Sequence, residues 1–577
     1  MLFGKQATTF LHILLLSTSS LAAPELSADL ANKLDHQFEK FDNGRSFLVD
    51  AIVNNGTTVS RDEWEQILSP DEDFSMTESD MEALRSYHAE IIEEASLRAV
   101  EDSPISIDDF RSDDDAVKQF CRNFPRAALV HIHPGGTLKS ETVDHLFNEI
   151  NPIVDSEKMI EIGKGERTML YPAEVEFLEG LTSGLRYLEH SEEDQNKIRD
   201  FLFLPKEPCC HEFPRFEALF SLKNVLLQDQ NASYYDETLY KDFLERTKSY
   251  GIDYVELTIT RVPPSLEKLK ELDDFLVELS SNYNMTVNYN VAFIRAFAAE
   301  MNNNFTTEFL EAMSSPTGSA FERTVGIDLL AEEANHPAFE RAQGIYIPIF
   351  DAWKSEKIPL NGMVMHAGES GQEYAPRNVR DGIIMGVTRI GHGPLLDREP
   401  LLMEYARRKQ TAFAMSLVSN WRLKVIIDDT ISNHPFLKFI RLGMPLSLST
   451  DDEGMFHTDI VNECVVAIQN FDIQYSELKG ISYTAVTSSL ADNSTKEALL
   501  EQLDSEFEAF ERVEEASLGP TNAPTESVEE ASLGPSTAPT ESVEEASLGP
   551  STAPASSAAA LIANFSLVSL TLIMALY

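Results

Sequence analysis

The chain has 577 residues, of which 43% are hydrophobic, so it is long enough to bury a large core and still carry additional segments. Its 95 acidic and 46 basic residues give a formal net charge of −49. Proteins that bind nucleic acid present basic surfaces, so this balance argues against a nucleic-acid partner.

The N-terminus has the pattern of a secretory signal peptide. Lys5 precedes an apolar run, and small residues follow up to Ala22, which predicts cleavage after residues 1–22. Secretion would place the chain in an oxidising compartment, and sequons such as the one at Asn231 predict a glycoprotein. The four cysteines are Cys121, Cys209, Cys210 and Cys464, and their spacing leaves the pairing open.

Residues 23–125 form a polar stretch with helical periodicity. A long helix is predicted over Glu78–Val100, with one apolar face. We interpret the stretch as an accessory helical region without catalytic residues. A homodimer, if one forms, is expected to use these helices.

Residues 126–512 alternate apolar runs with amphipathic helices, for example over Pro400–Lys409. Eight strands with helical connections predict an α/β fold, a (β/α)8 TIM-type barrel, rather than an open doubly wound sheet. A long insertion over about 137–250 separates the first two strands, and part of it is expected to overhang the site. The predicted strands are Ala127–His131, Tyr254–Ile259, Val287–Ile294, Val325–Leu330, Gly362–His366, Arg389–Gly391, Ala412–Leu417 and Pro445–Thr450.

The composition changes after Arg512. A 15-residue repeat rich in Pro, Ser and Glu fills residues 513–557, and such a sequence predicts a disordered stalk. Residues 558–577 are small and then apolar, with no basic residue after them, as in a GPI-attachment signal. The predicted location is therefore extracellular, on a lipid anchor at the cell surface. A secreted enzyme with a trimmed tail and a true tail anchor are the alternatives.

Chemically active residues stand at the ends of four predicted strands. His131 and His133 end the first, and two residues apart on a strand they share one face. His366, His392 and Asp451 end the fifth, sixth and eighth. In a parallel barrel these ends meet at one rim, and imidazoles with a carboxylate are a ligand set that suits zinc.

These strand-end motifs resemble those of the adenosine/AMP deaminase family. The N-terminal region and the phrase Phe213-Pro214-Arg215-Phe216-Glu217 look most like its secreted growth-factor subfamily. The resemblance implies that His131, His133, His366 and Asp451 bind one zinc ion per chain. It also implies that the substrate is a small purine nucleoside.

The resemblance further assigns roles beside the metal. It implies that Glu369 protonates N1 of the purine, that His392 orients the attacking water and handles its proton, and that Asp452 binds N7. Four departures from the family pattern concern the substrate: Gly135 where an acid usually holds the ribose, Ala331 where a glycine usually meets the purine edge, Met415-Ser416 in place of a usual Cys-Pro, and Phe213 where growth-factor relatives carry a tryptophan.

The predicted function is hydrolysis of adenosine, and of 2'-deoxyadenosine, to the inosine product and ammonia. Two alternatives stay open. One is a deaminase of another 6-aminopurine, such as AMP or adenine. The other is an inactive growth factor or binding protein on the same scaffold. How ribose is held without the usual acid is also left open.

Overall fold

The computed structural model describes residues 25–518, except residues 166, 207–210, 260–265, 298, 316–320, 371–373 and 427–429. The predicted signal peptide, most of the repeats, the predicted C-terminal signal, and Cys209 and Cys210 lie outside the described residues. Among the helices that are described, none is long and apolar enough to cross a membrane.

Eight parallel strands form a (β/α)8 barrel. Two four-stranded parallel sheets follow each other, in the orders β1-β2-β3-β4 and β5-β6-β7-β8. The backbone N–H of Asn361 donates to Val325 at 2.9 Å between β4 and β5, and a bridge between Ile132 and Asp451 joins the ends of β1 and β8. The strands are β1 Ala128–Ile132, β2 Tyr254–Ile259, β3 Thr286–Ile294, β4 Thr324–Leu330, β5 Val364–Ala367, β6 Arg389–His392, β7 Ala412–Met415 and β8 Leu446–Leu448.

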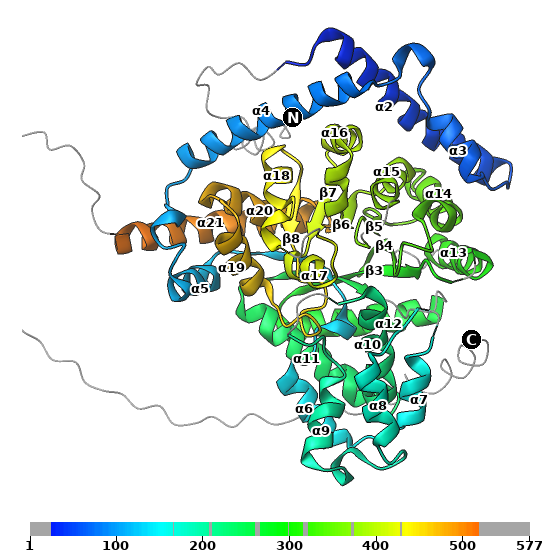
Figure 1. Cartoon of the computed structure of the whole chain (residues 1–577), viewed down its shortest axis with the longest axis vertical. Helices are drawn as coiled ribbons and strands as arrows, with labels where there is room; N and C mark the ends of the chain where they lie inside the picture. The colour runs from blue at the N-terminus through cyan, green and yellow to red at the C-terminus, as the bar shows by residue number, and fades with distance from the viewer. Residues whose placement is uncertain are drawn as a thin grey trace, which may run out of the picture.

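Helices follow the strands and surround the barrel in Figure 1. Their inner faces and the strands form one continuous apolar core, as expected for this architecture. After β2 to β8 they are α12 Leu266–Tyr283, α13 Ala299–Ser314, α14 Ala338–Lys354, α15 Ala375–Met385, α16 Pro400–Lys409, α17 Leu417–Arg422, α18 Phe436–Arg441, α19 Ile460–Asn470, α20 Tyr475–Thr487 and α21 Asn493–Leu518.

The insertion between β1 and β2 is helical and gathers at one end of the molecule, in cyan and green in Figure 1. It contacts the loop after β8: the Leu204 amide donates to the Met455 carbonyl at 3.3 Å, and the Phe216 and Phe456 rings stack. Its helices are α6 Ser140–Ile150, α7 Ser156–Ile162, α8 Pro172–Gly180, α9 Glu192–Asp200, α10 Phe213–Lys223 and α11 Ala232–Ser249.

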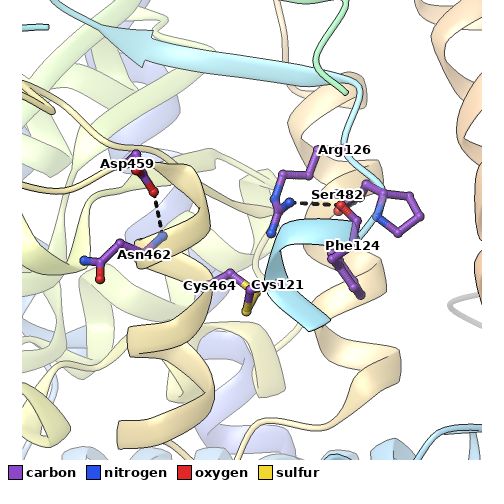
Figure 2. The surroundings of a disulfide bond; sticks show 8 residues. Cys121, Phe124, Arg126, Asp459, Asn462, Cys464 and Ser482 are labelled. Atoms are coloured by element: carbon purple, nitrogen blue, oxygen red, sulfur yellow. Dashed lines mark hydrogen bonds between the residues drawn. A yellow bond between two sulfur atoms is a disulfide. The ribbon is translucent and has the colours of Figure 1, made fainter. Parts of the chain in front are cut away.

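Three of the four N-terminal helices lie along the opposite side of the barrel, and the last lies beside helix α19 (Figure 1). They are α2 Ala28–Val49, α3 Arg61–Leu68, α4 Glu78–Glu101 and α5 Asp114–Asn123. Trp64 is fully buried, stacks on Phe339 and donates its indole N–H to Asp381 at 3.0 Å. A disulfide joins Cys121 in α5 to Cys464 in α19 (Figure 2). The N-terminal region is thus fastened to the barrel by both packing and a covalent bond.

The sequence predicted the barrel and all eight strands, with differences at the ends. The seventh strand ends at Met415, not at Leu417, because α17 begins there and Glu463 accepts hydrogen bonds from its first amides, Leu417 and Val418, at 2.9 and 3.4 Å. The predicted start of the disordered stalk, at residue 513, is too early. Helix α21 continues through the first residues of the repeat to Leu518, since Val-Glu-Glu-Ala is compatible with helix.

Candidate metal centre and active site

The ends of β1, β5, β6 and β8 bring four histidines and an aspartate together. His131 Nε2 lies 3.4 Å and His133 Nε2 3.2 Å from Asp451 Oδ1. His133 Nε2 and His366 Nε2 lie 3.1 Å apart. All of these side chains are buried. The other oxygen of Asp451 accepts a hydrogen bond from the Ser419 hydroxyl at 2.7 Å, which turns Oδ1 toward the histidines.

This donor set fits a tetrahedral metal ion. Ligand atoms about 2.0–2.1 Å from zinc lie about 3.3 Å from one another, close to the separations of 3.1–3.4 Å found here. His366 Nδ1 lies 3.0 Å from Asp328 Oδ1, so this carboxylate accepts the ring hydrogen on Nδ1. The lone pair of Nε2 is then free to bind a metal ion. Burial, aided by the neighbouring His366, lowers the pKa of His131 to about 4, and a neutral imidazole is the form that binds metal.

Two overlapping groups of metal-ligating atoms occur here among the described residues. One contains His131, His366, His392 and Asp451, and the other His133, Asp451 and Asp452. The predicted ligands are divided between the two groups, with His392 as a fifth candidate. His133 Nε2 lies 3.2 Å from Asp451 Oδ1 and 3.1 Å from His366 Nε2, which favours His133 over His392 as a ligand.

Glu369 faces His392 from the loop after β5. Its Oε1 lies 3.5 Å from His392 Nε2, and its side chain is buried. Burial, followed by the negative charges of Asp451 and Glu333, raises the pKa of Glu369 well above its ordinary value. A raised pKa favours the protonated carboxyl group, which is the form that can act as an acid.

The backbone of that loop is held by Glu333, which follows β4. Its carboxylate accepts the amide hydrogens of Gly368 at 3.0 Å, Glu369 at 2.5 Å and Ser370 at 3.0 Å. The Asn378 side chain donates to it as well, at 2.8 Å. These four hydrogen bonds to one buried carboxylate fix the backbone of Glu369, and so the place of its side chain in the site.

Asp452 lies under the glycine turn that follows β1. A Cβ on Gly136 would be 1.6 Å from Asp452 Oδ1, so only glycine allows this approach. That oxygen is buried and has no hydrogen-bond partner, which leaves it available to a ligand. The neighbouring Gly135 carbonyl accepts from Lys223 Nζ of α10 at 3.3 Å, and burial lowers the pKa of this lysine to about 7.

The remaining predicted contacts lie at the same rim but without a bond to the metal cluster. Ala331 directly follows β4 and has a φ of 82°, a conformation that favours glycine. Phe213 begins α10 and packs against Phe216 in a small apolar cluster that includes Leu395 and Val418. These two residues come from the segments after β6 and β7, so α10 borders the site.

Backbone strain marks the centre of the site. His392 and Asp451 have φ values of 69° and 60°, which non-glycine residues rarely adopt. Such conformations cost about 1–3 kcal/mol each and concentrate at functional sites. Gly391 is required for a different reason, because a Cβ there would lie 2.5 Å from His131 Cε1.

Sequence reasoning missed Asp328, Glu333, Ser419 and Lys223. Asp328 and Glu333 were visible as acids at the end of the fourth strand, and that position was the available signal. Lys223 comes from a helix of the insertion, and no local pattern places it beside Gly135. Arg389, at the start of β6, is structural: it is buried in an ion pair with Glu256.

Comparison with known proteins gives the family. Residues 210–506, slightly more than half of the chain, match the family model for adenosine deaminase. Adenosine deaminase of Enterococcus faecalis is 26% identical over 183 residues, 32% of this chain and 50% of the relative. Adenosine deaminase 2 of Sus scrofa is 27% identical over 206 residues, 34% of this chain and 38% of the relative. The chain therefore spans about half or less of these two curated relatives.

The fold is shared with a solved structure. The crystal structure of an amidohydrolase from Burkholderia ambifaria, with bound Zn, matches with a TM-score of 0.50 at 15% identity, over 69% of this chain and 94% of that one. At this identity the likeness concerns the fold alone. The family match over more than half of the length is the stronger finding, and by it this chain belongs to the adenosine deaminase family.

Proposed function

We propose that this protein is an extracellular, zinc-dependent adenosine deaminase that hydrolyses adenosine and 2'-deoxyadenosine at C6. The observation that carries the proposal is the buried cluster at the barrel rim, in which an acid and a further histidine stand beside a tetrahedral donor set. An inactive scaffold protein would have no need to keep the acid, the histidine and the metal ligands in contact.

His131, His133, His366 and Asp451 would hold the zinc ion. Three imidazoles and one carboxylate match its preference for nitrogen and oxygen donors. A zinc ion bound there would lower the pKa of a water molecule to about 7, so that a nucleophile is available at neutral pH. Ser419 and Asp328 keep two of these ligands, Asp451 and His366, in the binding orientation.

Glu369, His392 and Asp452 would divide the work on the purine. Protonated Glu369 donates to N1, which makes C6 electrophilic. His392 faces the same space and orients the attacking water. Purine N7 only accepts, so Asp452 would donate to it from a protonated carboxyl group, and burial and the neighbouring Asp451 raise the pKa of Asp452 well above its ordinary value. Oδ1 of Asp452 has no other hydrogen-bond partner, and this interaction would fix the ring in place.

Substrate choice depends on the ribose side of the pocket. Gly135 offers no carboxylate there, and Lys223 donates to its carbonyl. Adenosine is proposed as the main substrate on the basis of the family and of the two relatives named adenosine deaminase and adenosine deaminase 2. Deamination of AMP or adenine is the alternative, and the same assay distinguishes the substrates.

The test is to incubate the purified full chain with adenosine, 2'-deoxyadenosine, AMP and adenine and to measure ammonia and product. We expect turnover to be highest with adenosine. Glu369→Gln should keep its metal and lose about 10²–10⁴ in rate, because an amide cannot protonate N1. Turnover of none of the four purines by wild type would refute the proposed activity, and wild-type turnover by Glu369→Gln would refute the role of the acid.

The extracellular location is supported by the N-terminal signal pattern and by the Cys121–Cys464 disulfide, since such bonds persist in oxidising compartments. We further propose a lipid anchor attached within the repeats. Phosphatidylinositol-specific phospholipase applied to intact cells should release the deaminase activity. Activity that stays on the cells, together with a C-terminal peptide that still contains Tyr577, would contradict the anchor.

A further inference from the structure

A row of buried hydrogen bonds reaches His392 from the side opposite the metal ligands. It begins at the backbone of Phe436, the first residue of α18, and passes through His434 and Asn420. His434 is 3% exposed, and Asn420 and His392 are fully buried. None of the roles described so far uses His434 or Asn420.

The first two bonds have only one consistent direction. A backbone N–H can only donate, so His434 Nδ1 accepts from Phe436, at 3.1 Å. Burial lowers the pKa of His434 to about 3, which keeps the ring neutral, so Nε2 carries its single ring hydrogen. Nε2 therefore donates to Asn420 Oδ1, at 3.1 Å.

That bond orients the asparagine amide. With Oδ1 toward His434, the nitrogen Nδ2 faces His392 Nδ1 at 3.0 Å. An amide nitrogen donates and does not accept. His392 Nδ1 is therefore the acceptor, and the hydrogen of a neutral His392 ring must be on Nε2.

The same bond decides whether His392 can bind the metal ion. Its Nε2 has no hydrogen-bond partner in the described structure and lies 3.5 Å from Glu369 Oε1. A ring nitrogen that carries hydrogen has no lone pair for a metal ion. The hydrogen-bond row thus excludes His392 as a ligand and favours His133 as the third imidazole beside His131 and His366.

We propose that His434 and Asn420 are positioning residues that hold His392 in the Nε2–H tautomer, with this N–H aimed at the reacting water. In this form His392 orients the water by donating to it but cannot accept its proton, which corrects the proton-handling role implied by the family resemblance. The catalytic part of this inference rests on the proposed function; the tautomer itself does not. Both residues act through His392, and neither touches the purine.

Asn420→Asp tests the proposal with almost no change in shape. A carboxylate can still accept from His434, but its other oxygen also accepts, so it draws the ring hydrogen of His392 to Nδ1. We expect kcat to fall by about 10–100-fold, the usual effect of losing a supporting residue in a metal site, while KM and zinc content stay at wild-type values. Asn148→Asp, on the exposed face of α6, is the matched control.

The tautomer is read directly by nitrogen NMR of the purified full chain labelled with 15N-histidine. There are 13 histidines, and the His392 signals are assigned by their absence in His392→Gln. Wild type should show hydrogen on Nε2, and Asn420→Asp should show it on Nδ1. An unchanged tautomer in Asn420→Asp, or hydrogen on Nδ1 in wild type, would overturn the proposal.

His434 provides a second, independent arm. His434→Leu removes the donor to Asn420 and should lower kcat, whereas His434→Gln keeps an N–H at a similar reach and should restore most of it. Equal kcat in wild type and His434→Leu would overturn the part assigned to His434. If wild type deaminates no purine, the proposed function fails, while the NMR comparison still decides the tautomer.

Discussion

In the metal centre, three pairs of ligand atoms already have the separations of 3.1–3.4 Å that ligands of one metal ion have. His131 and Asp451 come from opposite ends of the strand order, and only closure of the barrel brings them to 3.4 Å. Ser419 holds the second oxygen of Asp451, and Asp328 holds Nδ1 of His366. These two ligands therefore need little reorganisation to bind a metal ion. Such a site is expected to bind metal tightly.

Loss of one ligand should therefore empty the site. We expect about one zinc per wild-type chain, and little in His131→Ala or Asp451→Ala, because each variant leaves only three protein ligands. His145→Ala removes an exposed histidine from α6 and should keep the metal. Metal analysis of the purified proteins makes the measurement. Full zinc in both ligand variants would contradict the assignment.

The approach of Gly136 to Asp452 is the tightest backbone contact in the site. Gly136→Ala would place a methyl group 1.6 Å from Asp452 Oδ1, and we expect the aspartate to be displaced and kcat/KM to fall. Overpacking of this kind also costs about 1–3 kcal/mol of stability. The control is Gly480→Ala in α20. A Cβ on Gly480 would meet no atom within 4 Å apart from its chain neighbours and the backbone of its own helix. There the substitution should leave activity intact and favour the helix by up to about 1 kcal/mol. Equal activity of the two variants would contradict the proposed role of Asp452.

At the scale of elements, the N-terminal helices bind the barrel through buried charges. Glu404 of α16 accepts hydrogen bonds from Arg407 and Arg408 and contacts His88 of α4, whose Nε2 lies 3.0 Å away. Burial opposes the charge on Glu404, but these partners overcome it and lower its pKa to about 2. The contact joins α4 to α16 only while the carboxylate is ionised.

Acid should weaken this junction. Because the pKa of Glu404 falls from 4.5 to about 2 on folding, its contribution is complete above pH 4.5 and is lost as the pH falls toward 2. Glu404→Gln lacks the contribution at every pH. Hydrogen exchange of α4 should thus be faster in the variant at neutral pH, and the difference from wild type should shrink below pH 4.5. A difference that stays constant over this range would exclude Glu404 as the cause.

Elements were more predictable than the contacts between them. Strands buried on both faces appear as apolar runs, so all eight were visible in the sequence, and the polar residues after them pointed to the site. The observed strand ends differ from the predicted ones where a tertiary contact decides the boundary. At α17, for example, the Leu417 amide donates to the Glu463 carboxylate. The row from Phe436 to His392 joins three chain segments, and the disulfide joins residues 343 apart. No local pattern encodes such pairings.

At the scale of the whole molecule, the segment that stabilises the barrel and the segment that borders the site are different parts of the chain. The N-terminal helices cover one side of the barrel, and the insertion borders the rim where the site lies (Figure 1). Variation in the insertion can therefore alter substrate choice without disturbing the strands. Residues of α10, among them Lys223, are the ones through which this would occur.

The Cys121–Cys464 bond has a topological consequence. It closes a covalent ring that contains all eight strands and every residue proposed to touch metal or purine. Closing so long a loop restricts the unfolded chain, by about 6 kcal/mol in the simple entropy model. A protease that cuts one peptide bond inside the ring would open it without separating any fragment, so the nicked barrel would stay one molecule. If the protein is extracellular, as we propose, a single cut by a protease need not inactivate it.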